Sequence, residues 1–358
     1  MTLECATCRP YACRTGRIES APEACPMHGP FPAFERLYTS EATLRLAYHA
    51  ARIEAEGYCR WTRIREVAEL ARRMGYQRIG IAHCRDMGRE AALAGRYLLD
   101  WGLDVIPADG ARDCDPIGQA KAFAARGSDF NVIAGMCVGH DALFARHSHV
   151  PVTSLVVRDL RLRHNPVAAL YTRKGYFKSA LDRRPSSAPP AAFHGWNDEV
   201  LDRVAREVRD AGARRADPPC RVEEVIDFAR RAGARHLGIV YCVGFREEAP
   251  QLAAVLTAHG FTVSSSCCKT GSVPKEKLGI RDSEQVRPGR PEMICNALAQ
   301  AALLEREGIE LALLLGQCVG HDSATMARFR VPVVAVVAKD RVLAHNTVAA
   351  LYELEGAS

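Results

Sequence analysis

Cysteine is the residue type in this sequence whose number and spacing point most directly to chemistry. The chain has 14 cysteines in 358 residues, and most of them fall in short motifs. No apolar segment follows a basic flank at the amino terminus, so we expect no export signal, a cytoplasmic location and reduced thiols. Clustered thiols in that compartment are typical of metal or redox sites. Isolated thiols such as Cys59 and Cys220 are as well explained as small core residues.

Four cysteines lie close together near the amino terminus. Cys5, Cys8, Cys13 and Cys25 fall within a segment that is too short to fold without a covalent or metal staple. Four thiolates suit tetrahedral zinc or a cubane cluster. We therefore predict a metal site formed by these four residues.

The rest of the chain contains an internal repeat. The block CVGHD at 137–141 returns 181 residues later at 318–322, and HNPVAALY at 164–171 returns at the same offset as HNTVAALY at 345–352. Such long-period similarity predicts two copies of one structural unit. The predicted divisions are a Cys-rich lead-in at 1–38, a first unit at 39–177, a Pro/Ser-rich linker at 178–195 and a second unit at 196–358.

Each unit alternates between short apolar runs and stretches of helical periodicity that end at glycine. This alternation predicts an α/β fold with a Rossmann-like parallel sheet in each unit, joined by right-handed crossovers. In the first unit we expect strands at 78–82, 103–106, 130–134 and 152–157, and helices at 62–75, 89–101, 115–126 and 141–146.

The remaining clustered cysteines follow predicted strands or precede predicted helices. Because the carboxyl ends of parallel strands share one edge, where open α/β sheets bind ligands, these thiols are expected to converge there. The first-unit set is Cys84, Cys114 and Cys137, and the second-unit set is Cys242, Cys267, Cys268, Cys295 and Cys318. Vicinal cysteines rarely ligate one metal together, so we expect Cys267 and Cys268 to divide their roles, which leaves a full ligand set and a spare thiol.

Three or four thiolates are the usual ligands of iron–sulfur clusters. We therefore expect a [4Fe–4S] cluster in the second unit, with a redox or sulfur-transfer role and an electron donor or a small sulfur or metal substrate as partner. One alternative is a zinc or soft-metal carrier or sensor without catalysis. Another is a protein-interaction platform in which only the lead-in binds metal. The residues do not decide whether the protein is an enzyme.

Polar residues beside the thiols are candidates for catalysis or ligation. Lys269 follows the vicinal cysteines and could lower a thiol pKa, hold an anion, or be a solvated charge. The histidines could ligate or transfer protons, whereas those that precede asparagine could instead fix a loop. Asp141 and Asp322 are expected to be helix N-caps. The catalytic candidates are Cys268, Lys269, His140, His164, His321 and His345.

Charge and hydropathy argue against two classes of partner. The chain has 48 basic and 42 acidic residues, a net charge of +6, but no dense basic run interleaved with aromatic residues. We therefore expect no nucleic-acid partner. No apolar stretch has the length needed to cross a bilayer, so we expect no membrane partner.

The CVGHD and HNPVAALY blocks resemble an uncharacterised prokaryotic domain family of unknown function described as predicted metal-binding proteins. Its members look like a single unit behind a Cys-rich segment, with CCK, Cys-Asn-Pro and KDR blocks in addition. The first copy lacks the CCK block, and the second has Asn346-Thr347 where the family has Asn-Pro. The resemblance implies metal binding but no particular reaction, and the fusion suggests that the two units form an internal pseudo-dimer. In the second copy the other matching residues are Cys242, Cys267-Cys268-Lys269, Cys295-Asn296, Lys339-Asp340-Arg341 and His345, and in the first copy they are Cys84, Cys114-Asp115-Pro116 and His164-Asn165-Pro166.

Overall fold

A computed structural model of the protein describes residues 2–29, 31, 33–108, 114–181, 193 and 195–353. Within this part of the chain, eight strands form two four-stranded sheets in which all strands are parallel. The strands are β1 (Arg78–Ala82), β2 (Asp104–Ile106), β3 (Phe130–Ala134), β4 (Val152–Val156), β5 (His236–Tyr241), β6 (Thr262–Cys267), β7 (Leu311–Leu315) and β8 (Val333–Val337). Their orders, β2-β1-β3-β4 and β6-β5-β7-β8, are equivalent and confirm the predicted α/β class with parallel sheets.

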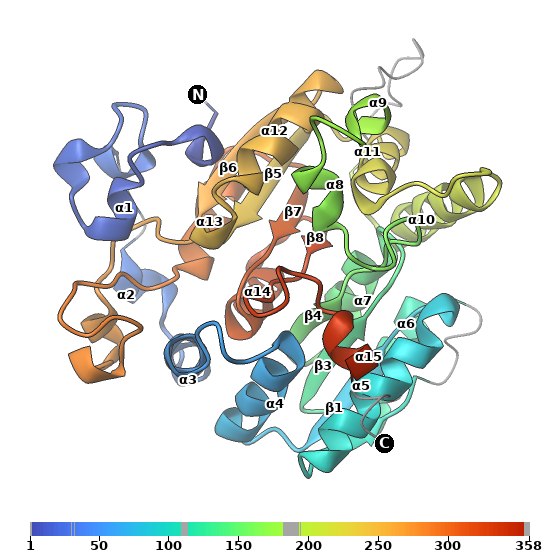
Figure 1. Ribbon diagram of the computed structural model, residues 1–358, viewed down its shortest axis with the longest axis horizontal. Helices are drawn as coiled ribbons and strands as arrows, with labels where there is room; N and C mark the ends of the chain where they lie inside the picture. The colour runs from blue at the N-terminus through green and yellow to red at the C-terminus, as the bar shows by residue number, and fades with distance from the viewer. Residues whose placement is uncertain are drawn as a thin grey trace.

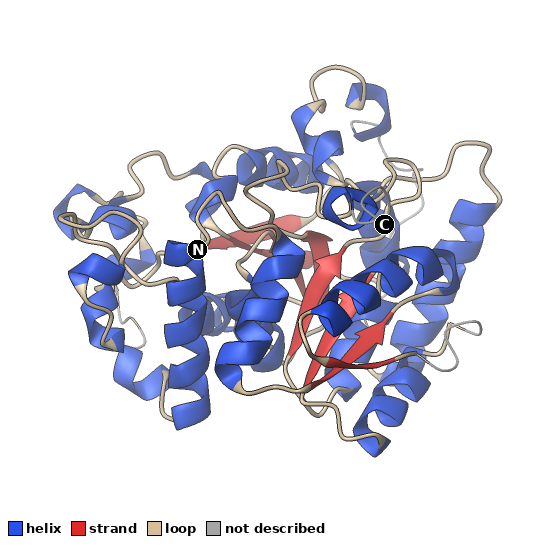
Figure 2. Cartoon of the chain, turned by 60° about the horizontal axis from the view of Figure 1, so that its bottom comes forward, coloured by secondary structure: helices blue, strands red, loops and turns tan. Residues whose placement is uncertain are grey.

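Helices surround both sheets, and Figure 2 shows the strands lying between them. None of the described helices is long and apolar enough to span a lipid bilayer. The described α-helices are α1 (Ala12–Thr15), α2 (Phe34–Leu37), α3 (Glu41–Glu56), α4 (Arg63–Met74), α5 (Gly88–Asp100), α6 (Pro116–Ala125), α7 (His140–His147), α8 (Val167–Tyr171), α9 (Lys178–Leu181), α10 (Asp198–Ala213), α11 (Arg221–Arg231), α12 (Glu248–Ala258), α13 (Ala297–Arg306), α14 (Val319–Arg328) and α15 (Ala349–Glu353).

Most of the strands are short apolar runs, as expected where both faces of a sheet are covered, whereas β6 contains Ser264, Ser265 and Ser266. Every residue of β3, β4, β7 and β8 is buried. The pairing of β3 with β4 shifts register after Ile133, and the pairing of β7 with β8 shifts after Leu314. These two positions are equivalent in the repeat, so the two sheets share even this irregularity.

Helices from each half of the chain pack against the other half. α14 contacts α3, α4 and β4, and α7 reciprocally contacts α10 and β8. Arg63, the first residue of α4, donates to Asp322, and Arg221, the first residue of α11, donates to Asp141 at 2.6 Å. All four side chains are at most 3% exposed.

These ion pairs correct the prediction that Asp141 and Asp322 are helix N-caps. The N-cap residues of α7 and α14 are Gly139 and Cys318, so each aspartate lies inside the first turn. The prediction was wrong because it considered only the local helix end. A buried guanidinium from the other half is the stronger partner for a carboxylate, since the hydrogen bond is charge-assisted.

The lead-in lies along the edge strand of the second sheet. The backbone N–H of Ser265 in β6 donates to the carbonyl of Leu3 at 2.7 Å, and Ser272 Oγ donates to the carbonyl of Cys13 at 2.8 Å. Figure 1 shows the lead-in beside α12, on the opposite side of the molecule from α6. Of the predicted linker, residues 178–181 form α9, while 182–192 and 194 lie outside the described residues.

Gly316 carries the chain from β7 towards the second CVGHD block in a left-handed conformation, with φ +59. A Cβ atom there would overlap the buried ring of Phe245. We expect Gly316→Ala to lower the free energy of unfolding by about 2–4 kcal/mol, combining overpacking with an unfavourable φ. Gly308→Ala is the matched control, because Gly308 has φ +74 but no atom near the added Cβ, and it should lose only about 1–2 kcal/mol. Urea unfolding measures both, and equal losses would contradict the packing argument.

Candidate metal centres

Four cysteines of the second unit meet at the carboxyl edge of its sheet. Cys242 follows β5, Cys268 follows β6, and Cys318 comes shortly after β7. Cys295 precedes Asn296, whose side chain caps α13 by accepting from the N–H of Ala299. Parallel strands deliver their ends to one edge, and this brings cysteines from four separate segments together.

The four thiols form one connected group, which we call the second-unit thiol group. Hydrogen bonds link Cys242 to Cys268 and to Cys318, and link Cys268 to Cys295. Each of the four residues is at most 4% exposed. Four thiols linked in this way offer a set of soft donors.

Two cations from the loop after β8 lie against one side of the second-unit thiol group. Nζ of Lys339 lies 2.7 Å from Sγ of Cys242 and 3.5 Å from Sγ of Cys318. The Arg341 guanidinium donates to Sγ of Cys318 at 3.3 Å. Such donors stabilise thiolates, and they would also offset the negative charge of a metal held by them.

Lys269 lies on the other side of the group. Its Nζ is 3.4 Å from Sγ of Cys295 and 2.6 Å from the carbonyl of Met293. The hydrogen bond from Cys268, followed by the charge of Lys269, lowers the pKa of the Cys295 thiol well below its ordinary value, although burial opposes this. In contrast, the pKa of Cys242 is raised to about 11, because this thiol donates to Cys268. Cys295 is therefore the thiol of this group that ionises most readily.

Two carboxylates on helices of the first unit complete the surroundings. Glu54 on α3 accepts from Arg341 at 2.6 Å and lies 3.9 Å from Sγ of both Cys295 and Cys318. Burial opposes ionisation of Glu54, but Lys269 and Arg341 hold its pKa well below the ordinary value. Burial raises the pKa of Glu66 on α4 to about 8. The site is thus built from both halves of the chain.

The candidate histidines have two different environments. His321 on α14 contacts Cys318, and His140 on α7 contacts Cys137 and lies 3.3 Å from Asp202. In contrast, Nδ1 of His345 accepts from the N–H of Asp340 at 3.2 Å.

His164 makes the equivalent bond with the N–H of Asp159, also at 3.2 Å. Both His164 and His345 have positive φ, at +65 and +68. The contacts of these two histidines therefore match the loop-fixing alternative, in which the ring stabilises a tight backbone turn.

The first unit has a smaller version of the same site. A hydrogen bond between Cys84 and Cys137 raises the pKa of Cys84 and lowers that of Cys137. Arg158 stands at the position of Lys339, and Leu160 stands at that of Arg341. Cys114 lines the same cavity of about 650 Å³ as the other two thiols.

The four lead-in cysteines gather around Cys267. Together with Cys267 they line one small cavity, and Cys13 shares a hydrogen bond with Cys267. Burial raises the pKa of Cys5 to about 11. Cys267, the last residue of β6, therefore lies between the two groups of thiols. It lines the lead-in cavity and also shares a hydrogen bond with Cys268, which follows it in the turn after the strand.

Among the described residues, no three or more Cys, His, Asp or Glu side chains are arranged around one point as ligands of a single ion. The fit of a metal therefore rests on the chemistry of the donors, which are four buried thiols beside three cations within 3.5 Å.

Sequence reasoning missed the contributions of Arg63, Glu54 and Glu66 to the second-unit site. The NH1 of Arg63 donates to the carbonyls of Gln317 and Lys339, at 2.8 and 3.3 Å, and so fixes the backbone on two sides of the site. The internal repeat could have indicated two of these three residues, Arg63 and Glu66. Arg-x-x-Glu at 63–66 returns at 221–224, at the same offset as Cys84 and Cys242.

Fold and site together define a thiol-rich α/β protein with two parallel sheets and a separate Cys-rich segment. The chain belongs to the DUF1847 family, described as proteins of unknown function, whose profile matches residues 31–109, 104–155 and 191–336. It is 36% identical over 132 residues to an uncharacterized protein of Methanocaldococcus jannaschii, and the match covers 37% of this chain. The chain spans 66% of that relative's length, just under two thirds.

Two solved structures superpose only loosely on the chain. Dph2 from Pyrococcus horikoshii, crystallised with a 4Fe-4S cluster, is 12% identical with a TM-score of 0.23, covering 82% of this chain and 92% of that one. An aspartate racemase homologue from the same organism is 14% identical with a TM-score of 0.20, covering 78% and 99%. Superpositions this loose carry no argument about function.

Proposed function

We propose that the protein is a cytoplasmic iron–sulfur protein with a redox or sulfur-transfer role, and that Cys242, Cys268, Cys295 and Cys318 hold a [4Fe–4S] cluster. The observation that carries this proposal is the second-unit thiol group, four buried and connected thiols from four chain segments. Burial by itself disfavours thiolates, whereas the adjacent side chains of Lys269, Lys339 and Arg341 favour them and so offset that effect. When bound, such a cluster supplies electron transfer or an open iron position for a substrate.

The residues around the thiols have separate tasks in this proposal. Lys339 and Arg341 offset thiolate charge on one side, while Lys269 does so at Cys295. Glu54 holds Arg341 in place. A large cavity also adjoins this site at Lys269. A purely structural zinc site is closed and needs no such cavity.

We propose two further sites of the same kind. Cys5, Cys8, Cys13 and Cys25 would hold a zinc ion or a second cluster, with Cys267 beside it. Cys84, Cys114 and Cys137 would form a three-thiolate site in the first unit. The two units would act as an internal pseudo-dimer with an external electron donor or small sulfur or metal substrate, because charged side chains from one unit line the thiols of the other.

Anaerobic purification tests the central proposal. We expect a brown protein with iron and acid-labile sulfide in equal amounts and visible absorption that bleaches on reduction by dithionite. The double substitution Cys8→Ser/Cys25→Ser should leave the iron, sulfide and absorption of the second-unit cluster in place, because it affects only the lead-in. Colourless protein with zinc and no sulfide would contradict the proposal and favour the carrier or sensor alternative.

A further inference from the structure

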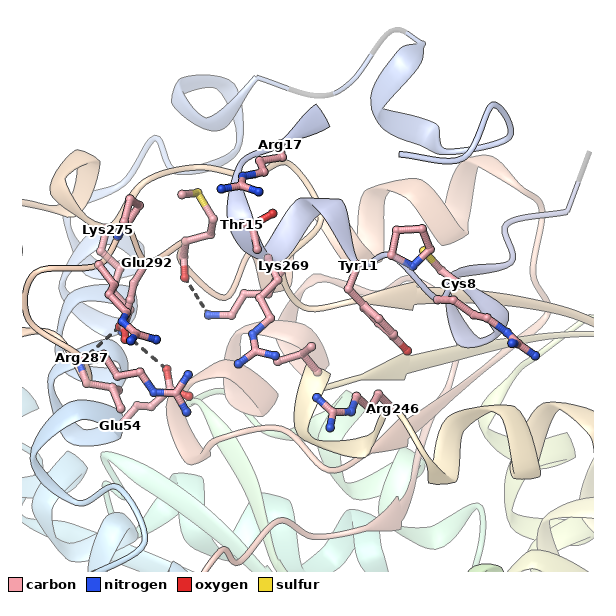
Figure 3. A pocket seen from close by; sticks show the side chains of 18 of the residues that line it. Cys8, Tyr11, Thr15, Arg17, Glu54, Arg246, Lys269, Lys275, Arg287 and Glu292 are labelled. Atoms are coloured by element: carbon pink, nitrogen blue, oxygen red, sulfur yellow. Dashed lines mark hydrogen bonds and ion pairs between the residues drawn. The ribbon is translucent and has the colours of Figure 1, made fainter. Parts of the chain in front are cut away.

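A basic cavity lies beside the second-unit thiol group. It has a volume of about 1150 Å³ and opens between the lead-in, α3 and the segment that follows Cys268 (Figure 3). Eight of its lining residues are Arg or Lys and three are Glu. A concave surface lined mainly by one sign of charge concentrates the opposite charge.

Most of these cations form no ion pair with a carboxylate in the described part of the chain. Arg17 on the lead-in wall, and Arg287 and Arg290 on the opposite wall, have no carboxylate within 4.0 Å among the described residues. Lys275, in contrast, pairs with Glu292 at 2.7 Å. Guanidinium groups gathered without carboxylates repel one another, and a bound anion would remove that repulsion.

The cavity adjoins the second-unit thiol group through two of its lining side chains. Lys269 lines it and is also 3.4 Å from Sγ of Cys295, and Glu54 lines it and lies 3.9 Å from the same sulfur. Figure 3 shows Lys269 between Tyr11 and Lys275. A ligand in this cavity would therefore lie next to the proposed cluster.

We propose that this cavity binds a nucleotide-sized organic phosphate. Guanidinium groups are the side chains best matched to phosphate, because they donate two parallel hydrogen bonds. The volume is that of a site for an organic ligand rather than for a free phosphate ion. The rings of Tyr11 and Tyr58 offer apolar surface for the organic part. The binding of this ligand does not depend on the proposed function. A contact between the ligand and an iron–sulfur cluster does rest on the proposed function.

Calorimetric titration of the full chain with ADP tests the inference, with citrate as a polyanion that lacks phosphate. We expect saturable ADP binding, at least about tenfold weaker citrate binding, and at least about tenfold weaker ADP binding in Arg287→Ala/Arg290→Ala. The control Arg96→Ala/Arg235→Ala removes the same charge from exposed positions outside the cavity and should change ADP affinity by less than about twofold. Circular dichroism verifies that both double variants are folded.

Three results would overturn the inference: no saturable ADP binding, citrate binding as tight as ADP, or equal weakening in the pocket and control variants. Iron and sulfide are assayed on the same samples. A protein that contains the cluster but does not bind ADP contradicts only this inference, and a protein that binds ADP but lacks iron contradicts only the proposed function.

Discussion

Cys318→Ser is expected to remove the iron of the second unit and the visible absorption that belongs to it, while metal held by the lead-in stays bound. Cys318 is the point where Cys242, Lys339 and Arg341 meet, so its loss removes one thiol and leaves Arg341 without its sulfur partner. Loss of a residue that merely supports a ligand typically weakens metal binding about 10–100-fold. Loss of a ligand itself should have a larger effect.

The measurement is iron and sulfide content together with the visible spectrum, compared with Cys59→Ser. Cys59 is exposed and lies outside every thiol group described above, so its replacement should preserve both readings. The proposed centre is refuted if Cys318→Ser retains wild-type iron and spectrum.

Arg63→Met should lower the free energy of unfolding by about 3–5 kcal/mol, the usual effect of removing one partner from a buried ion pair. Arg63 is 1% exposed, and besides Asp322 it donates to the carbonyls of Ser154 and Gln317 at 2.6 and 2.8 Å. Methionine fills much of the space but cannot donate to the carbonyls, and it leaves Asp322 with the hydroxyl of Thr153 but no cation. Denaturant unfolding measures the loss.

The matched control is Arg203→Met, because Arg203 pairs with Glu207 at 2.8 Å on the exposed face of α10. Surface pairs contribute little, so that variant should change stability by less than about 1 kcal/mol. Adding Asp322→Asn to Arg63→Met should recover part of the loss, since the orphaned charge is then removed. If Arg63→Met is no more destabilising than Arg203→Met, the pair does not hold the two halves together.

The elements of the fold could be predicted because they depend on local patterns. A strand covered on both faces reads as an apolar run, and helices were recognised by their periodicity and glycine ends, so that α4 and α5 begin and end within a residue of the predicted limits. The N-cap assignment of Asp141 and Asp322 was wrong because the partners of these two residues are not local. Their partners, Arg221 and Arg63, are 80 and 259 residues away in the chain.

The candidate site likewise combines features that local sequence patterns predict with contacts that only the tertiary structure shows. Strand order alone explains why Cys242 and Cys318 lie near one another, because all strand ends of a parallel sheet share one edge. The contact of Cys267 with the lead-in cysteines depends on the position of the lead-in along β6, which only the tertiary structure provides. No local pattern could indicate that Glu54, on a helix of the other unit, lies 3.9 Å from two of the thiols.

The sequence by itself determined the duplication, the α/β class and the edge of each sheet at which the cysteines stand, since periodicity and repeat offsets are properties of neighbouring residues. Only the tertiary structure decided which thiols touch, which cations and carboxylates surround them, and that a basic cavity adjoins them. Those contacts join residues from both units and the lead-in. They depend on how the helices of one half pack against the other, and no short stretch of sequence encodes that packing.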